Sequence, residues 1–599
     1  MKRLFLFILP LLCAGKLQAK EVTPEQALQT ADRFWQSAPA TRAATAPRWQ
    51  RIQPDESSAT RTAASHPAYY IFDNTAGGGF VIVAGDDAVR PVLGYSFENE
   101  FPAEGLPENL RAWLDGMSLE VNNARAAGDA ADPYMASAWA ETRAGTPVVE
   151  METALWNQEA PYNNLCPRSS VGTRTFTGCT TTALAIIMRY HQWPERGSGT
   201  LAGYHIDMND ITVPEIQLGH AYDWANMLMK YGYSYQYTDT EATAVATLMR
   251  DCAIMLQSNF GIVGSSGTSA ALERIPNALI SYMDYDKQTR YVYRRHYTAT
   301  SWNEMMRNEM DNHRPVLYSG YGPHGSGHAF VLDGYTDDDY FHVNWGWGGT
   351  SNGYFLLTAL NPNGQGAGAS DTNTYNLNQV VVIGIQKDQG NDYRDELRMV
   401  VHENYTGLST DGQVVTGQPF TLHIGNLFNN STRVFNGEVM IAVTDKNGQI
   451  IEELETFNYS GYSPGAGNIF DHTLTVRSTI LPGYRIRAYY RSTNMTDWAI
   501  VYANEESGCV WDLLIDDAQS IEETTSLTFD RKSRQLQLQI KEGVTTTLLD
   551  SGGADRTSAC RIDGQTISID TSDLTAGTYR LVLQKRNDRK ELRFTVSAR

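Results

Sequence analysis

Two residues combine a reactive side chain with an unusual local context, and the first is Cys179. It follows Gly178 and precedes three threonines and an apolar run over residues 183–188. A glycine, then hydroxyl residues, then an apolar run predicts the start of a buried helix. At such a position the helix dipole and the free N–H groups lower the pKa of a thiol and favour the thiolate. Cys179 is therefore a candidate nucleophile, and the alternative is an ordinary buried cysteine in a core helix.

The second residue is His328, which lies in the sequence Gly-Ser-Gly-His-Ala-Phe-Val over residues 325–331. A strand is predicted after it, and three aspartates at 337–339 predict a turn into a second strand. This hairpin returns Asn344 and Trp345 alongside His328. A histidine that is oriented by a third group and partnered with a distant cysteine is the arrangement of a cysteine hydrolase. The alternative for His328 is a strand-end histidine held by the backbone.

Other residues near these two carry supporting chemistry. The run from Trp345 to Gly349 reads Trp-Gly-Trp-Gly-Gly, and its indoles either pack in a tight turn or shield a thiolate–imidazolium pair from water. Gln158 follows Trp156 and Asn157, and its amide can donate to a developing oxyanion together with the Cys179 backbone N–H. His191 is excluded as the partner because it lies 12 residues beyond Cys179, roughly 18 Å along the same helix.

Taken together, these motifs resemble the streptopain/interpain family of secreted bacterial papain-like cysteine proteases. The resemblance covers roughly residues 22–387 and rests on several motifs in the same order. They are Trp156-Asn157-Gln158, Gly178-Cys179, Gly327-His328-Ala329-Phe330-Val331 and the run from His342 to Gly349.

The resemblance implies a role for each matching residue. Cys179 would be the nucleophile, His328 the general base and acid, and Gln158 the oxyanion donor. Either Asn344 or Trp345 would orient His328: the spacing of Asn344 suits the papain arrangement, whereas the streptopain pattern assigns the task largely to the tryptophan. Two further residues, Ser269 and Gly327, would line the substrate cleft.

The elements before residue 146 form a unit with its own core. Strands are predicted over 69–72, 80–84 and 92–95, and a helix over 110–121. The resemblance implies that residues 20–145 are an inhibitory propeptide. We expect the loop from Ser96 to Gly105 to lie nearest Cys179 and His328. The Ala-rich stretch over 126–147 predicts an exposed linker that is cleaved around Arg143 to Thr146.

The predicted fold class is α+β: a papain-like catalytic domain preceded by an α+β propeptide and followed by C-terminal β-sandwich domains. The protease domain spans 146–387. Short alternating runs separated by Gly/Asn turns predict a β-sandwich over 396–515 and a second small β domain over 524–599. The last domain weakly resembles the sorting tails of type IX secretion.

Composition limits the function further. The formal net charge of −20 argues against general nucleic-acid binding and against adhesion to an anionic membrane. Six cysteines without a CxxC pair, and no HExxH, make a structural zinc site unlikely, and no cofactor is expected. Residues 1–19 combine a basic start, a short apolar run and a small residue at the end, which is typical of a cleaved signal peptide. No other segment suggests a transmembrane helix, so we expect a secreted protein: extracellular, periplasmic or outer-membrane-associated.

The leading hypothesis is thus a secreted cysteine endopeptidase made as a zymogen, which acts on proteins or peptides through a covalent acyl-enzyme. One alternative is a cysteine amidase that acts on cell-wall peptides. Another is a surface adhesion protein whose Cys–His pair is not catalytic.

Overall fold

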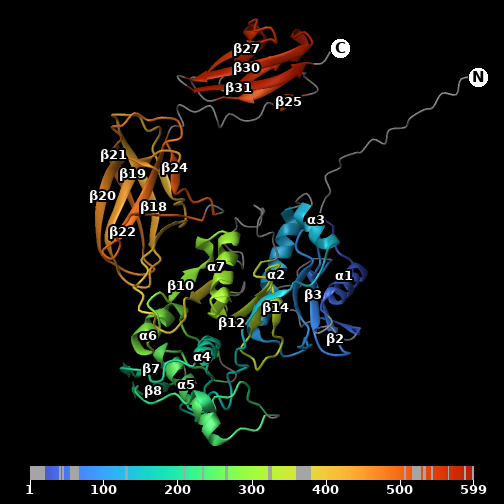
Figure 1. Ribbon diagram of the computed structural model, residues 1–599, viewed down its shortest axis with the longest axis vertical. Coiled ribbons are helices and arrows are strands. Elements are labelled where there is room, and N and C mark those ends of the chain that lie inside the picture. The colour runs from blue at the N-terminus through green and yellow to red at the C-terminus, as the bar shows by residue number, and fades with distance from the viewer. Residues whose placement is uncertain are drawn as a thin grey trace, which may run out of the picture. The chain divides into compact units, whose positions relative to one another are not determined.

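The structure is a computed structural model of the 599-residue chain. It describes residues 20–39, 42, 46–53, 66–127, 133–207, 210–232, 235–262, 267–321, 327–358, 379–504, 507–515, 528–530, 535–540, 544–563, 566–585 and 588–596. The predicted signal peptide, residues 1–19, lies outside this part. The chain forms two compact units that divide after residue 394 (Figure 1).

An eleven-stranded antiparallel sheet runs through the whole first unit. Four of its strands come from the predicted propeptide: β1 (Trp49–Ile52), β2 (Tyr69–Asn74), β3 (Phe80–Ala84) and β4 (Val92–Ser96). The sheet continues through β14 (Gly353–Phe355), β13 (Phe341–Asn344), β12 (Gly327–Thr336), β11 (Val316–Tyr321), β15 (Val380–Ile383) and β10 (Arg290–Tyr293), and β5 (Pro147–Glu150) pairs with β12.

The joint between propeptide and protease domain is the pairing of β4 with β14. Tyr95 lies opposite Tyr354, and Gly94 lies opposite Phe355. A side chain at residue 94 has no room, because an added Cβ would come within 2.5 Å of the Phe355 ring. The glycine therefore allows the two domains to share one sheet.

Helices cover both faces of the sheet (Figure 1). Residues of α1 (Pro24–Ser37), α2 (Glu108–Ala127) and α7 (Ala299–Asp311) enter one hydrophobic core, and residues of α4 (Cys179–His191), α5 (Asp239–Met255) and α6 (Ile275–Tyr282) enter the other. The strands alternate between these cores as the pleat requires: in β12, Phe330 and Leu332 belong to the first, and Ala329 and Val331 to the second. Two small two-stranded sheets pair β6 (Thr200–Leu201) with β9 (Ile216–Gln217) and β7 (Tyr204–Ile206) with β8 (Ile211–Val213).

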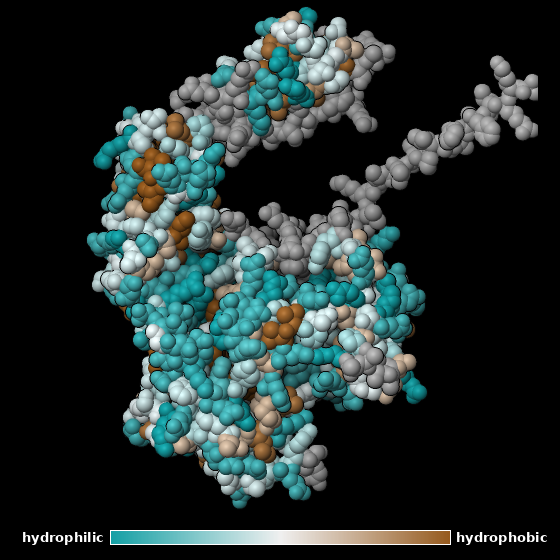
Figure 2. Space-filling view, viewed as in Figure 1, coloured by the Kyte–Doolittle hydropathy of each residue, from teal (hydrophilic) through white to brown (hydrophobic). Residues whose placement is uncertain are grey.

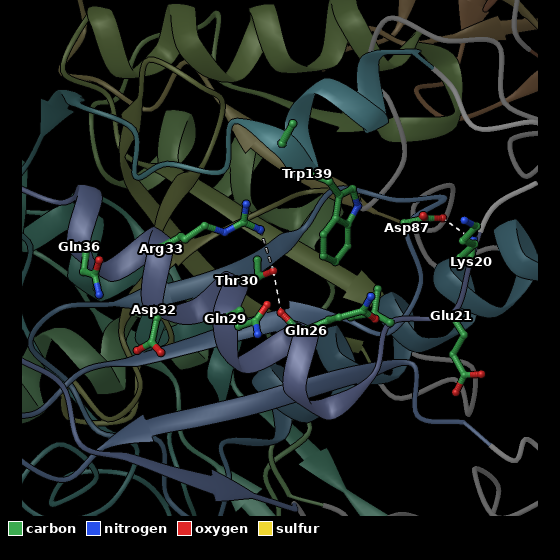
Figure 3. Close-up of a pocket in the computed structure, with 12 residues that line it drawn as sticks. Lys20, Glu21, Gln26, Gln29, Thr30, Asp32, Arg33, Gln36, Asp87 and Trp139 are labelled. Atoms are coloured by element: carbon green, nitrogen blue, oxygen red, sulfur yellow. Dashed lines mark hydrogen bonds between the residues drawn. The ribbon is translucent and has the colours of Figure 1, made fainter. Parts of the chain in front are cut away.

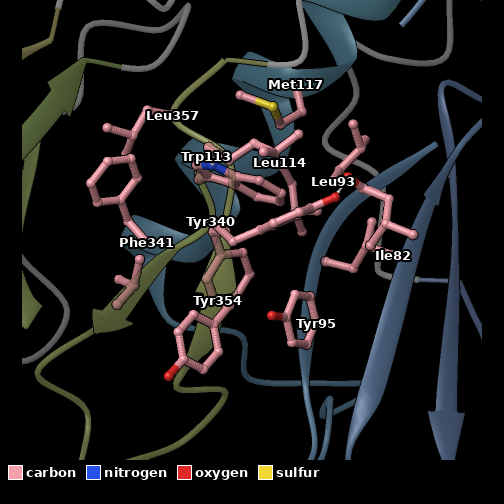
Figure 4. Close-up of a cluster of buried hydrophobic side chains, with 14 of the residues drawn as sticks. Ile82, Leu93, Tyr95, Trp113, Leu114, Met117, Tyr340, Phe341, Tyr354 and Leu357 are labelled. Atoms are coloured by element: carbon pink, nitrogen blue, oxygen red, sulfur yellow. Dashed lines mark hydrogen bonds between the residues drawn. The ribbon is translucent and has the colours of Figure 1, made fainter. Parts of the chain in front are cut away.

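The first core is built jointly by the propeptide and the protease domain (Figure 4). Ile82, Leu93 and Tyr95 of the propeptide strands and Trp113, Leu114 and Met117 of α2 pack with Tyr340, Phe341, Tyr354 and Leu357. Trp113 also donates from Nε1 to the carbonyl of Leu356 at 2.9 Å. The visible face of this unit is mostly hydrophilic, with isolated apolar patches (Figure 2).

The expectation of an exposed linker before residue 147 is correct only in part for its described residues: Arg143 and Thr146 are exposed, but the segment is not an open loop. Residues Pro133–Ala140 form helix α3, and Trp139 of that helix donates to the carbonyl of Val89 at 2.8 Å. Ala144 is buried, with 7% of its surface exposed. The composition is that of a loop, but tertiary contacts hold the segment against the domain.

The second unit is all-β in its described residues. β16 (Leu397–Val400), β17 (Leu408–Thr410), β18 (Pro419–Asn429) and β21 (Gly467–Thr475) form one sheet, and β19 (Phe435–Thr444), β20 (Ile450–Tyr462), β22 (Arg485–Ser492), β23 (Ala499–Ile500) and β24 (Asp512–Leu514) form another. One core draws residues from both sheets, including Leu422 of β18 and Ile441 of β19. This arrangement confirms the predicted β-sandwich.

The last residues form two further sheets around their own core. One contains β25 (Thr528–Asp530), β26 (Gln535–Gln539), β28 (Cys560–Asp563) and β29 (Thr566–Asp570), and the other contains β27 (Thr545–Leu549), β30 (Gly577–Lys585) and β31 (Asp588–Val596). The α+β fold class with C-terminal β domains is therefore confirmed. Within the described residues, no helix has the length and apolar character needed to cross a membrane.

Candidate active site

Cys179 is the first residue of α4, as the sequence predicted. The preceding Gly178 has φ 87°, and an added Cβ would lie 2.7 Å from the carbonyl oxygen of Thr268. Only glycine can adopt this positive φ with the Thr268 carbonyl so close to it. The helix behind it is buried from Thr180 to Met188, which confirms the predicted buried helix start. Gly178 and the buried helix together fix where the thiol points.

The thiol lies against strand β12, beside His328. Cys179 Sγ accepts the N–H of Ala329 at 3.5 Å, and Ala329 follows His328 in the chain. The two sequence candidates, 149 positions apart, are thus brought together by the packing of α4 on β12.

The expected lowering of the Cys179 pKa is not found in this structure. Burial raises the pKa of the Cys179 thiol, and the hydrogen bonds from Ala329 and Thr180 offset this only in part. Desolvation of the charged form outweighs the helix N-terminus here. Cys179 itself is half-buried in this structure.

His328 faces the propeptide. Its Nδ1 lies 3.9 Å from Oε2 of Glu108, the first residue of α2. Burial lowers the pKa of His328, and the Glu108 carboxylate partly offsets this. His328 and Cys179, which both belong to the described residues, form no hydrogen bond with each other. His328 is near the nucleophile but contacts the propeptide.

Asn109, the next residue of α2, holds the strand and the turn around His328. Its Nδ2 donates to the carbonyl of Trp345 at 2.6 Å and to that of Ala329 at 3.4 Å, and the residue is 1% exposed. The expectation that the loop from Ser96 to Gly105 approaches His328 most closely is therefore wrong: the contacts come from the two residues that begin α2. A signal for Asn109 existed in the sequence, because it is a polar residue four positions before Trp113 on the apolar face of the helix.

Gln158 is joined to the segment that leads to Cys179. Its carbonyl accepts the N–H of Thr177 at 3.2 Å, two residues before the nucleophile. The Asn157 side chain accepts the N–H of Gln158 at 2.7 Å, which holds the backbone at this point.

The two predicted cleft residues lie on different elements. Ser269 is exposed and pairs with Asn259, and the next carbonyl, of Ala270, accepts the Thr180 hydroxyl at 3.4 Å. Ser269 is therefore beside the start of α4. Gly327 begins β12 and lies opposite Tyr321 in β11.

Asn344 is fully buried and its amide has partners other than His328. Nδ2 donates to Thr153 Oγ1 at 2.9 Å and to the carbonyl of Ala154 at 3.0 Å, and Oδ1 accepts the N–H of Gly346 at 3.1 Å. These bonds tie the start of the protease domain to the turn after Trp345. In strand register Asn344 lies opposite Val331, three residues along from His328.

Trp345 is buried between two phenylalanines. Its ring centroid lies 4.9 Å from that of Phe330 and 5.0 Å from that of Phe355, and Nε1 donates to the carbonyl of Ser351 at 3.0 Å. The indole is thus fixed next to the strand residues that follow His328. Gly346, at φ 74°, then turns the chain toward Thr182 of α4.

A buried network that the sequence did not reveal lies behind Asn344. Asp333 accepts the Thr153 hydroxyl through Oδ2, and its Oδ1 lies 2.5 Å from His342 Nδ1. Burial lowers the pKa of His342, but the Asp333 carboxylate more than offsets this and the pKa is raised overall. His342 is paired within the domain, so the structure gives it a packing role.

A cavity of about 710 Å³ lies elsewhere in the molecule (Figure 3). Residues of α1, with Lys20, Asp87 and Trp139, line it, and it contains neither Cys179 nor His328. Across the described residues there is no group of three or more His, Cys, Asp or Glu side chains that could hold a metal ion.

Comparison with known proteins identifies the family. A family model described as the peptidase C10 family matches residues 156–355. Streptopain from Streptococcus pyogenes is 33% identical over 334 residues, which cover 53% of this chain and 80% of streptopain. The chain belongs to the peptidase C10 family. This membership confirms the predicted resemblance and the predicted enzyme class, a cysteine protease.

Other similarities extend beyond the protease domain. A family model described as a Spi protease inhibitor matches residues 19–121, so a domain of the inhibitor-propeptide type precedes the peptidase C10 domain. Thiol protease/hemagglutinin PrtT from Porphyromonas gingivalis is 37% identical over 399 residues, or 64% of this chain, but the chain spans only 44% of that protein. A prointerpain A fragment from Prevotella intermedia has a TM-score of 0.45 at 27% identity, covering 57% of this chain and 99% of the fragment.

The close approach at Gly178 predicts a large effect of a small substitution. Gly178→Ala should lower kcat/KM about tenfold or more, because the new Cβ collides with Thr268 and displaces the thiol. Gly172→Ala is the matched control: Gly172 has φ 84° but open space around its Cβ position. Peptide hydrolysis by the two variants measures the difference. Equal losses would show that backbone strain, and not the contact with Thr268, limits residue 178.

The contacts of Asn344 and Trp345 predict different consequences for the two residues. Asn344→Ala should lower the free energy of unfolding by ~1–3 kcal/mol, because it leaves buried backbone groups unpaired. It should leave the pH profile of kcat/KM unchanged. Trp345→Ala should shift that profile if the indole shields the ion pair. A shifted profile for Asn344→Ala with an unshifted one for Trp345→Ala would assign the orienting role to Asn344 instead.

Proposed function

We propose that the protein is a secreted cysteine endopeptidase made as a zymogen, with Cys179 as nucleophile and His328 as general base and acid. The observation that carries this proposal is the contact of Cys179 Sγ with the N–H of Ala329, immediately beside His328. Once Glu108 has moved away, His328 is free to turn from the propeptide toward the thiol. A thiolate–imidazolium pair then forms, as in other Cys–His hydrolases.

In the reaction, the Cys179 thiolate attacks the scissile carbonyl carbon, and the electron pair moves to the carbonyl oxygen. The Cys179 backbone N–H and the Gln158 side-chain amide donate to that oxyanion. The His328 imidazolium gives its proton to the leaving amine, and the acyl-enzyme remains on sulfur. His328 then takes a proton from water, whose oxygen attacks the acyl carbon and releases the second product. The proposed substrates are proteins and peptides, bound between Ser269 and Gly327.

The start of α2 supplies the proposed latency. Glu108 faces the imidazole, and Asn109 bridges the carbonyls of Ala329 and Trp345. A carboxylate beside His328 competes with the thiolate for the same imidazolium. The segment 20–145 therefore acts as an intramolecular inhibitor, and we propose that export, with loss of residues 1–19, precedes its release.

The first prediction of the proposed function concerns the nucleophile. Cys179→Ala should abolish cleavage of casein and processing of the chain itself together, because both need the same thiolate. Cys166→Ala, which removes a thiol whose pKa burial raises to about 12, should keep substantial activity. Mass spectrometry of the casein fragments and of the enzyme reports both reactions. Loss of casein cleavage alone, with self-processing intact, would require a second protease.

If casein is untouched by the parent but cell-wall peptides are cut, the amidase alternative replaces the endopeptidase. If neither is cut and a thiol-directed probe does not label Cys179, the adhesion alternative holds.

The second prediction concerns inhibition by the propeptide. Residues 20–145, produced separately and added to the mature enzyme, should inhibit it. Asn109→Ala in that segment should weaken inhibition about tenfold or more, because the carbonyls of Trp345 and Ala329 lose a buried donor. Asn99→Ala, which removes a donor to the Asn352 carbonyl but leaves the bonds of Asn109 in place, is the control. A folded parent segment that fails to inhibit at large excess would rule out the proposed inhibitory role.

A further inference from the structure

One turn of the protease domain holds the segment in which the sequence predicts processing. This turn, Asp337–Asp339, joins β12 to β13. Asp337 Oδ1 accepts the N–H of Thr146 at 2.8 Å, and the N–H of Asp337 donates to the carbonyl of Thr146 at 2.9 Å. Arg143 Nη2 also lies 3.7 Å from Asp337 Oδ2, but both groups are exposed and such pairs contribute little. The two hydrogen bonds are therefore the main contacts.

The same segment is held from its other side by the propeptide. The N–H of Ala144 donates to Oγ of Ser37, the last residue of α1, at 2.7 Å. Gly145 packs so closely on the turn that an added Cβ would meet Asp338 Oδ1 at 1.9 Å. Residues 144–146 are thus fixed between α1 and the turn.

The turn also holds the body of the propeptide. Arg90 is buried, donates to the carbonyl of Asp338 at 3.0 Å, and its guanidinium lies 4.7 Å from the Tyr340 ring centroid. The Tyr340 hydroxyl donates to the carbonyl of Val92, the first residue of β4, at 2.7 Å. Adjacent residues of one turn therefore bind both the propeptide and the segment that connects it to the protease domain.

A protease must bind several residues around the scissile bond in an extended form, and a segment whose backbone is engaged elsewhere reaches a cleft only after local opening. We propose that the turn Asp337–Asp339 is a latch on the processing segment Arg143–Thr146. The latch requires the propeptide to loosen before the connecting chain can be cut. This inference rests on the proposed zymogen function, because it assigns that zymogen an order of events: undocking first, cleavage second.

The test uses an added protease on the full chain carrying Cys179→Ala, so that self-cleavage plays no part. Trypsin can cut after Arg143, and the readout is the rate at which chains beginning at Ala144 appear, followed by mass spectrometry. Asp337→Ala should raise this rate about tenfold, because the segment loses its side-chain acceptor on the turn. Ser37→Ala, which weakens the segment from α1 without touching the turn, should raise it severalfold.

Asp339→Asn is the matched control, because Asp339 lies in the same turn but contacts Arg307 of the protease domain. It should leave the rate at the parent value. Rates for Asp337→Ala and Ser37→Ala both equal to the parent would overturn the latch, and so would an Asp339→Asn rate as high as that of Asp337→Ala. If Asp337→Ala lowers the midpoint of thermal unfolding, the cleavage rate of Ser37→Ala alone is used to judge the latch. Failure of the proposed zymogen function is seen separately, as an active parent chain that never processes itself.

Discussion

The sheet of residues 20–394 must be covered on both of its faces, and the rest of the unit follows from that requirement. Along β12, Ala329 and Val331 enter the core under α4, whereas Phe330 and Leu332 enter the core shared with the propeptide. By the same alternation His328 belongs to the propeptide side of the strand. Cys179 therefore approaches from one face and His328 points to the other. In the proposed zymogen, the cover on the second face holds His328 away from the thiol.

Burial also bears on the charge state of Cys179 and His328. Burial raises the pKa of the Cys179 thiol and lowers the pKa of the His328 imidazole. Both shifts favour the neutral thiol and the neutral imidazole over a thiolate–imidazolium pair. In the proposed zymogen, a neutral pair of this kind would be inactive. In that proposal, removal of α2 takes Glu108 away from His328.

The features that the sequence predicted are those that local pattern determines. The helix that begins at Cys179, the hairpin from Gly327 to Asn344, the propeptide strands and the C-terminal β-sandwich all follow from short-range periodicity and turn residues. Local pattern carries no information on which distant residues meet. That is why the contacts that Glu108 and Asn109 make with the site, and the network of Thr153 and Asp333 behind Asn344, were not found.

The segment that connects the propeptide to the protease domain, residues 126–147, shows a second limit of prediction from local pattern. Its composition, rich in alanine and glycine, predicted an open linker, and for a free peptide that expectation is sound. In the folded chain Ala144 and Gly145 are small enough to pack against α1 and the Asp337–Asp339 turn, so the composition that suggests a loop is also what permits close packing. Small residues are ambiguous in this way until their neighbours are known.

The central claim is that the propeptide keeps Cys179 neutral and separated from His328. The most direct measurement is the rate of Cys179 alkylation by iodoacetamide as a function of pH, in the full chain and after the propeptide is removed. The account predicts slow alkylation of the full chain that rises only at alkaline pH, and fast alkylation of the processed enzyme that persists into the acid range. The same rate and the same pH profile in both forms would contradict it.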